Sequence, residues 1–336
     1  GTDANNYDVT KVEGTLTVTD NTTPIVITSS DKSFEYDCAL HTDEVYNVTY
    51  GGAGVPVESD GKTFTLPTGD KLVITSTTSG VRYYDATYSE NNTFQYTLEH
   101  NDQYKGDRDT TFGTLTITKR PIVITANSKD KPYDGIALID NGFTTNGNEA
   151  PCDEVASAVV TGSQTEVGTS DNTVVDAVIK DKTSGDVVTD NYEITYVKGE
   201  LEVTSIEVNV TITKHGKKEI FDGETHSVSG YDFLSSNPEL FKRDDLKFIG
   251  EVSDSIATGV EVGKYGMTFT KESFENLNKN FSAVNITIVE DSLEITPIAV
   301  DVTITKHGLT EAYDGEEHSV SGYDFLSSNP ELFKRD

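Results

Sequence analysis

Aspartate-rich loops are the first candidates for a functional site, because carboxylate oxygens are ligands that Ca²⁺ prefers. Two loops stand out, NDQYKGDRD at 101–109 and DKTSGDVVTD at 181–190. Neither fits the helix-loop-helix calcium pattern, and acid clusters on a very acidic chain usually face water. Calcium is the single cofactor that the sequence suggests. Its candidate ligands are Asp102, Asp107, Asp109, Asp181, Asp186 and Asp190, with Glu251 and Asp254 as a further pair.

Histidines offer a second route to a metal site. Two of them recur at a fixed offset, His215 with His307 and His226 with His318. A two-histidine site is one interpretation, but duplicated segments repeat their histidines without any metal, and we favour that second interpretation. On this alignment His41 and His100 have no counterpart, and we expect both at the surface.

The cysteines and the catalytic motifs argue for a structural protein. Cys38 and Cys152 lie in different repeats and at different positions within them, so we expect two free, buried thiols; a bridge between domains or between chains is the alternative. The sequence contains no GxSxG, no HExxH and no phosphate-binding glycine loop. We therefore expect no enzyme and no catalytic residue.

Composition excludes other classes. The 336 residues carry a formal net charge of −31, whereas nucleic-acid binding needs clustered Lys and Arg. No segment is long and apolar enough to span a membrane. The many Thr, Val, Asp and Gly residues favour strands with one solvated face.

A tandem repeat sets the organisation. The phrase KPYDG at 131–135 returns as EIFDG, EAYDG and, less well kept, FEYDC, with aromatics spaced by 97, 88 and 92 residues. Such a period suits small all-β domains. The expected segments are 1–20, the end of a preceding repeat; 21–119, 120–205 and 206–297, three whole immunoglobulin-like repeats; and 298–336, the start of another.

Strand patterns support a β-sandwich in each repeat. Each copy of the ending has a last strand of alternating apolar residues, such as Leu16 and Val18 or Leu201 and Val203. Gly14, Gly113 and Gly199 precede this strand in three of the four copies and suggest a terminal hairpin. Pro24, Pro121 or Pro297 follows the last strand of a unit within a few residues, which leaves almost no flexible linker. We therefore expect stiff coupling and a rod on the order of 100 Å for three repeats.

The YDG phrase predicts a tight turn, with Asp accepting a backbone hydrogen bond and Gly adopting positive φ. Cys38 replaces this glycine in the first repeat, where we expect a different turn. The predicted turn residues are Tyr133, Asp134, Gly135, Phe221, Asp222, Gly223, Tyr313, Asp314 and Gly315.

The third repeat carries an insertion, SGYDFLSSNPELFKRDDL at 229–246. Asn237 followed by Pro238 and Glu239 predicts the start of a short helix of one or two turns. The segment 208–244 recurs at 300–336 with 31 of 37 positions identical, which indicates recent duplication within a longer array.

Together, the PIVIT entry strand, the KPYDG turn, VGKY at 262–265 and the NYEIT…GELEVT ending resemble the MBG and YDG family of bacterial immunoglobulin-like repeats. The resemblance implies tandem β-sandwich domains of large, secreted or cell-wall-anchored adhesins. It also implies an extracellular, cell-surface location. It carries over no binding residue.

Three functions follow as hypotheses. The first is a non-enzymatic stalk or spacer of a surface adhesin or fibre. The second is that the repeats bind host or environmental glycans or mucin, through tyrosines such as Tyr83, Tyr84 and Tyr88. The third is self-association through exposed strand edges. An isopeptide bond between Lys131 and Asn191 would be a further stalk device, but the other repeats have no lysine at that position.

Overall fold

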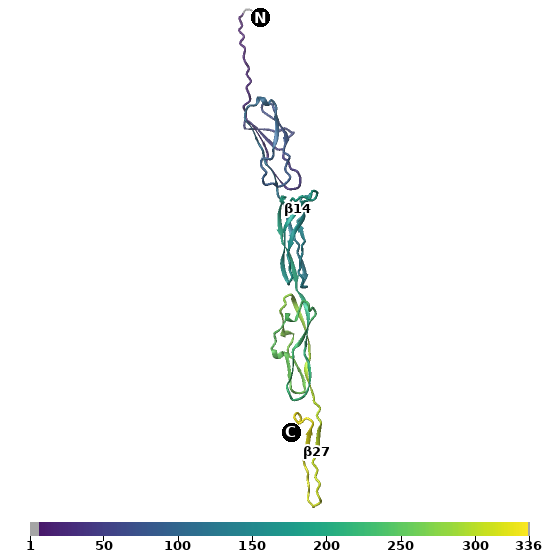
Figure 1. The fold of residues 1–336 in the computed structure, drawn as a ribbon. Helices are drawn as coiled ribbons and strands as arrows, with labels where there is room; N and C mark the ends of the chain where they lie inside the picture. The colour runs from purple at the N-terminus through teal and green to yellow at the C-terminus, as the bar shows by residue number, and fades with distance from the viewer. Residues whose placement is uncertain (1–6, 335–336) are drawn as a thin grey trace. The chain divides into compact units, whose positions relative to one another are not determined.

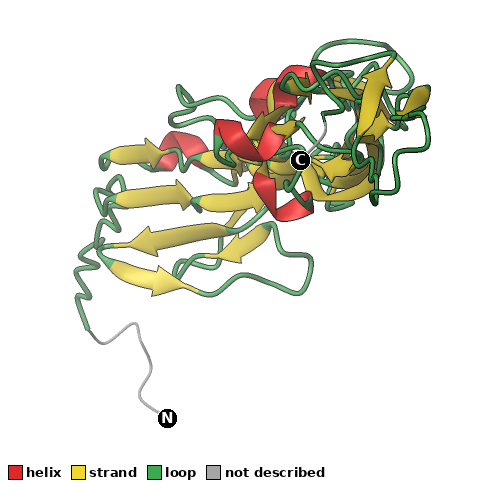
Figure 2. Cartoon of the chain, turned by 90° about the horizontal axis from the view of Figure 1, so that it is seen from below, coloured by secondary structure: helices red, strands yellow, loops and turns green. Residues whose placement is uncertain are grey.

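The computed structural model of the protein describes residues 7–334, which form strands, turns and loops (Figure 1). The all-β prediction is confirmed: the helical segments of the described residues are 3₁₀ turns of three or four residues (Figure 2). These turns are η2 (Asn101–Gln103), η3 (Thr189–Asn191), η4 (Arg243–Asp245), η5 (Val252–Ser255) and η6 (Lys271–Ser273).

The first repeat builds one core between two sheets, ordered β4-β3-β1-β8 and β5-β6-β7, with the pair β2-β9 beside them. Ile27 and Val48 from one sheet meet Leu72 and Ile74 from the other, and all four are at most 2% exposed. The strands are β1 (Ile25–Ser29), β2 (Lys32–Glu35), β3 (Tyr46–Tyr50), β4 (Ala53–Val55), β5 (Thr63–Thr65), β6 (Lys71–Thr77), β7 (Phe94–Leu98), β8 (Arg108–Thr111) and β9 (Leu115–Thr118).

The second repeat contains the sheet β12-β10-β15, the antiparallel pair β13 and β14, and the parallel pair β11 and β16. Ile124 and Ala126 of β10 are buried against Val174 and Ala177 of β14. The strands are β10 (Arg120–Ala126), β11 (Lys129–Pro132), β12 (Phe143–Thr145), β13 (Asp153–Thr161), β14 (Gly168–Asp181), β15 (Tyr192–Val197) and β16 (Gly199–Thr204).

The third repeat contains the sheets β20-β17-β25 and β18-β26-β23 and the pairs β19-β22 and β21-β24. The next segment contains the pair β27 (Val302–Lys306) and β28 (Tyr323–Ser327). The third-repeat strands are β17 (Ile206–Lys214), β18 (Lys217–Ile220), β19 (His226–Ser229), β20 (Tyr231–Ser235), β21 (Leu246–Phe248), β22 (Ile256–Gly259), β23 (Gly263–Gly266), β24 (Phe274–Asn276), β25 (Phe281–Val289) and β26 (Ser292–Thr296).

One topology recurs in all three repeats. The first strand pairs in parallel with the next-to-last strand, as β1 with β8, β10 with β15 and β17 with β25. The second strand pairs in parallel with the last, as β2 with β9, β11 with β16 and β18 with β26. Because the last two strands bind different partners, the predicted terminal hairpin is wrong.

The glycines before the last strands serve a close backbone approach instead. A Cβ on Gly113 would lie 2.2 Å from the Ser30 carbonyl oxygen, and one on Gly199 would lie 2.3 Å from that of Asn127. Neither distance is sterically allowed, so these positions require glycine. The alternating pattern that follows is formed as expected, since Leu201 and Val203 are at most 1% exposed.

The predicted short helix does not form. Residues 237–241 form one hydrogen-bonded turn, with the Phe241 N–H donating to the Asn237 carbonyl at 2.9 Å, and no α-helix follows. The three residues that favour a helix start, Asn237, Pro238 and Glu239, do not offset the cost of helix nucleation. In 7–20, Leu16 and Val18 are 91% and 82% exposed and no described strand pairs with them, so the assignment of 1–20 to the end of a preceding repeat stays a prediction. Residues 1–6 and 335–336 lie outside the described residues.

The chain divides into two compact units. One contains the residues up to Asn127 with Asp140–Gly162 and Asn172–Gly199, and the other contains Ser128–Ile139, Ser163–Asp171 and the residues from Glu200 onward. The division falls inside the second repeat, so the domain boundaries at 120 and 206 stay predictions. Each meeting of consecutive repeats therefore lies within a single unit.

Candidate functional site

In each predicted YDG turn, the aspartate side chain accepts a hydrogen bond from a backbone N–H. The side chain of Asp134 accepts a hydrogen bond from the Ile136 N–H at 2.9 Å, and Asp222 and Asp314 accept equivalent bonds two residues on at 2.9 and 3.0 Å. The glycines that follow these aspartates have φ of 74°, 83° and 85°. Hydrogen bonds to the charged form lower the pKa of each of these carboxyls.

Cys38 adopts the conformation of the glycine that it replaces, so the expectation of a different turn is wrong. Its φ is 70°, and the Asp37 side chain accepts a hydrogen bond from the Ala39 N–H at 2.8 Å. The aspartate bond and the left-handed backbone are therefore present with cysteine at this position as well as with glycine. A side chain in this left-handed region costs about 1–2 kcal/mol, which the glycine copies avoid.

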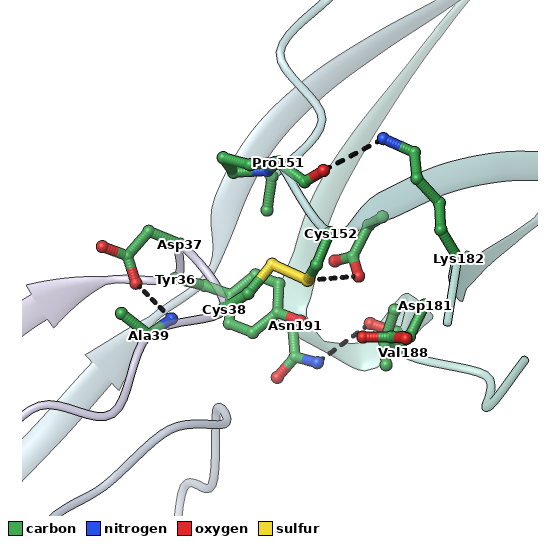
Figure 3. The surroundings of a disulfide bond; sticks show 12 residues. Tyr36, Asp37, Cys38, Ala39, Pro151, Cys152, Asp181, Lys182, Val188 and Asn191 are labelled. Atoms are coloured by element: carbon green, nitrogen blue, oxygen red, sulfur yellow. Dashed lines mark hydrogen bonds between the residues drawn. A yellow bond between two sulfur atoms is a disulfide. The ribbon is translucent and has the colours of Figure 1, made fainter. Parts of the chain in front are cut away.

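Cys38 and Cys152 form a disulfide between the first and second repeats, which corrects the expectation of free thiols (Figure 3). Their Cα atoms lie 6.3 Å apart, within the usual range for a disulfide. The cysteines occupy different positions in their repeats because each belongs to one side of a contact between repeats. The bond therefore belongs to the alternative that joins domains.

Buried aromatic and acidic groups surround this bond; we call the region the first junction. The rings of Tyr36 and Tyr192 meet edge to face at 5.6 Å, and the Tyr192 hydroxyl donates to Asp153 at 2.7 Å. All three residues are at most 3% exposed. Burial, together with the Asp153 carboxylate, raises the pKa of both tyrosines, so both hydroxyls stay protonated as donors.

An equivalent set joins the second and third repeats; we call it the second junction. The rings of Tyr133 and Phe281 lie 6.1 Å apart edge to face, and Phe241 packs on Phe281 at 4.9 Å. A Cβ on Gly135 would lie 2.9 Å from Leu240 Cδ2, so the turn glycine contacts the leucine of the NPELF turn. The Leu240–Gly135 contact therefore takes the place in the second junction that the Cys152–Cys38 bond has in the first.

The turn at Phe221, Asp222 and Gly223 in the third repeat makes the same contact with the segment that follows that repeat. A Cβ on Gly223 would lie 2.6 Å from Leu332 Cδ2, and Leu332 occupies the place of Leu240 at an offset of 92 residues. The YDG turn of one repeat therefore packs against the turn that begins NPEL in the next, and the disulfide replaces that contact in the first junction.

One asparagine in each junction binds the backbone of the preceding repeat. Asn191 Oδ1 accepts the Tyr84 N–H at 2.8 Å, and Asn280 Oδ1 accepts the Val167 N–H at 2.8 Å. Each asparagine precedes the aromatic residue that packs on the YDG turn. Sequence reasoning missed this role, although the recurring Asn-aromatic pair at the start of the ending motif was a visible signal.

The candidate isopeptide partners have other contacts. Lys131 Nζ donates to Asp134 at 2.5 Å and to the Ile136 carbonyl at 2.6 Å. Asn191 is engaged with Tyr84 and donates to the Val188 carbonyl at 3.1 Å. Both residues stabilise local turns and junction contacts.

Histidines pair with the turn aspartates. His226 and His318 contact Asp222 and Asp314 at 2.9 and 2.8 Å, and His41 contacts Asp37 at 2.8 Å. His41 therefore has counterparts, contrary to expectation, and the three histidines stabilise turns. His215 contacts Asp232 at 3.1 Å, and that carboxylate raises the pKa of His215.

The candidate calcium ligands are distributed over separate elements. Asp102 lies in η2, Asp109 in β8 and Asp190 in η3, while Asp107 and Asp186 lie in exposed loops. Asp181 accepts the N–H groups of Thr183 and Ser184, both at 2.8 Å. Within residues 7–334, one group of three side chains of metal-binding type comes together: Cys38, Cys152 and Asp153. The two cysteine sulfurs of this group are bonded to each other in the disulfide. Calcium binding stays a prediction.

The tyrosines proposed for glycan binding lie at the first junction. Tyr84 and Tyr88 pack against its core, and Lys119 Nζ lies 4.7 Å from the Tyr84 ring. Tyr83 is 46% exposed and stacks on Tyr36 at 6.3 Å. Glycan binding through these tyrosines stays a prediction.

Comparisons with known proteins leave the family open. No protein-family model matches the chain, and no curated protein sequence matches it. Among solved structures, the chain is similar to one titled "Crystal structure of Dscam1 isoform 8.4, N-terminal four Ig domains", at 11% identity over 81% of this chain and 72% of that chain, with a TM-score of 0.16. That score supports no conclusion about function. Within the described residues, no helix is long and apolar enough to cross a membrane.

Proposed function

We propose that the chain is a non-enzymatic stalk or spacer segment of an extracellular bacterial surface adhesin or fibre, built from tandem immunoglobulin-like repeats of the MBG and YDG type. The observation that carries the proposal is the recurring junction. In the first and second junctions, an aspartate turn, an aromatic pair and an asparagine join consecutive repeats, as resistance to tension along the chain requires.

Short connections support stiff coupling. Lys119 alone separates β9 from β10, and Ser205 alone separates β16 from β17. One residue offers few backbone torsions for bending, and side chains from both repeats pack beside it. The repeats would then transmit orientation along the chain.

Redox chemistry and charge support the proposed location outside the cell. Disulfides persist in oxidising surroundings such as the cell exterior. The net charge of −31 favours solubility and discourages compaction by self-repulsion. Both features suit a segment displayed outside a cell.

Small-angle scattering of the whole chain tests this proposal. Three repeats in line predict a maximum dimension of at least roughly 100 Å from the rise per strand residue. A compact particle well below that length would contradict stiff coupling. Saturable binding to mucin or a glycan panel, with calcium or with chelator, would instead make the repeats adhesive.

A further inference from the structure

We infer that the Cys38–Cys152 disulfide is a mechanical bypass: under tension applied to the chain ends, it removes residues 39–151 from the segment that carries the force. The inference rests on the proposed stalk function for its biological meaning. Its physical content rests on connectivity alone, since the bonded residues are 114 positions apart.

The path of the force follows from the chain order. Tension that enters before β1 runs through β1 and β2 to Cys38, crosses the sulfur–sulfur bond, and continues from Cys152 into β13. The strands β3 to β12 lie between the two cysteines in sequence. They form a closed covalent loop that tension cannot stretch end to end.

The loop contains most of the first repeat's core. Ile25 and Ile27 of β1 lie on the loaded part, whereas Val48, Leu72 and Ile74 lie inside the loop. Force can shear β1 from β3 and β8, but the strands left behind stay joined to one another. Their unfolded state has less conformational entropy than an open chain, which favours refolding once tension falls.

The other junctions have no disulfide bypass, because both cysteines of the sequence are used in the Cys38–Cys152 bond. Extension limited by a covalent bond is therefore specific to the first two repeats. It is also reversible by a dithiol. One thiolate attacks a sulfur, the second closes the reagent's own disulfide, and Cys38 and Cys152 take up two electrons and two protons.

Single-molecule pulling on the full chain through terminal handles tests the inference. The oxidised chain should release less length on complete unfolding than the same chain treated with a dithiol. The expected difference is about 400 Å, from 114 residue steps of roughly 3.6 Å each. The variant with Cys38→Ser and Cys152→Ser should give the longer value with or without dithiol.

Two results would overturn the inference. One is equal released length for oxidised and dithiol-treated wild-type chain, a comparison that needs no variant to fold. The other is alkylation of both cysteines in folded chain prepared without reductant. Neither result depends on the scattering experiment, so failure of the bypass and failure of the stalk proposal are distinguishable.

Discussion

The first and second junctions perform one task with different chemistry. In the first, Cys38 is bonded to Cys152 and two tyrosines enclose the Asp153 carboxylate; in the second, Gly135 contacts Leu240 and three aromatic rings pack together. Both keep the asparagine that binds the preceding backbone. The comparison indicates that backbone hydrogen bonding and turn geometry define the junction, while the side chains that fill it can vary.

Removing the disulfide should have the largest effect. The double change Cys38→Ser and Cys152→Ser should lower the free energy of unfolding of the first two repeats by about 2–5 kcal/mol. Hydrogen exchange should accelerate around Tyr36 and Tyr192 and stay unchanged around Phe281. Denaturant unfolding followed residue by residue checks both, and equal acceleration at the two junctions would refute their independence.

The paired changes Asn191→Ala and Asn280→Ala compare the shared element directly. Each leaves one backbone N–H without its acceptor, at a cost of about 1–3 kcal/mol. Exchange of the Val167 amide should rise more in Asn280→Ala than exchange of the Tyr84 amide does in Asn191→Ala, because the disulfide still closes the first junction. The reverse order would show that the covalent bond does not restrain the junction.

Substitutions at the equivalent turn positions 135 and 38 should change stability in opposite directions. Gly135→Ala forces a side chain into left-handed backbone and against Leu240, and should destabilise by about 1–2 kcal/mol. In a Cys152→Ser background, Cys38→Gly should be more stable than Cys38→Ser, since glycine adopts this conformation without strain. Thermal unfolding measures both, and a destabilising Cys38→Gly would contradict a common turn.

The smallest expected effect is a difference between the pKa changes of Asp134 and Asp37 in an acid titration. Lys131 is the main cause that lowers the pKa of Asp134, whereas the Ala39 N–H is the main cause for Asp37. Lys131→Met should therefore raise the pKa of Asp134 more than His41→Gln raises that of Asp37.

The sign of the pH effect follows from these shifts. A lowered carboxyl pKa stabilises the fold above the ordinary value of about 3.9, and the contribution is lost as pH falls through the lowered pKa. Carbon-detected NMR titration of the two carboxyls measures the shifts. Equal shifts in both variants would contradict the different origins assigned here.

Local features could be predicted from the sequence and long-range ones could not. Alternation at Leu201 and Val203 reports strand burial, and Asp-Gly pairs report turns, because both depend on residues a few positions apart. Cys38 and Cys152 are 114 positions apart and meet only where two repeats touch. The pairing of β15 with β10 and of β16 with β11 also depends on distant residues. For this reason the glycine before the last strand suggests a hairpin from local sequence, although the two last strands pair elsewhere.

The central claim is that buried junctions couple consecutive repeats stiffly. Residual dipolar couplings measured on the full chain for the second and third repeats test it most directly. If the coupling is stiff, one alignment tensor should fit the amides of β10–β16 and β17–β26 together. Combining Asn280→Ala with Leu240→Ser should then give each repeat its own tensor. Two distinct tensors in the wild-type chain would contradict the claim.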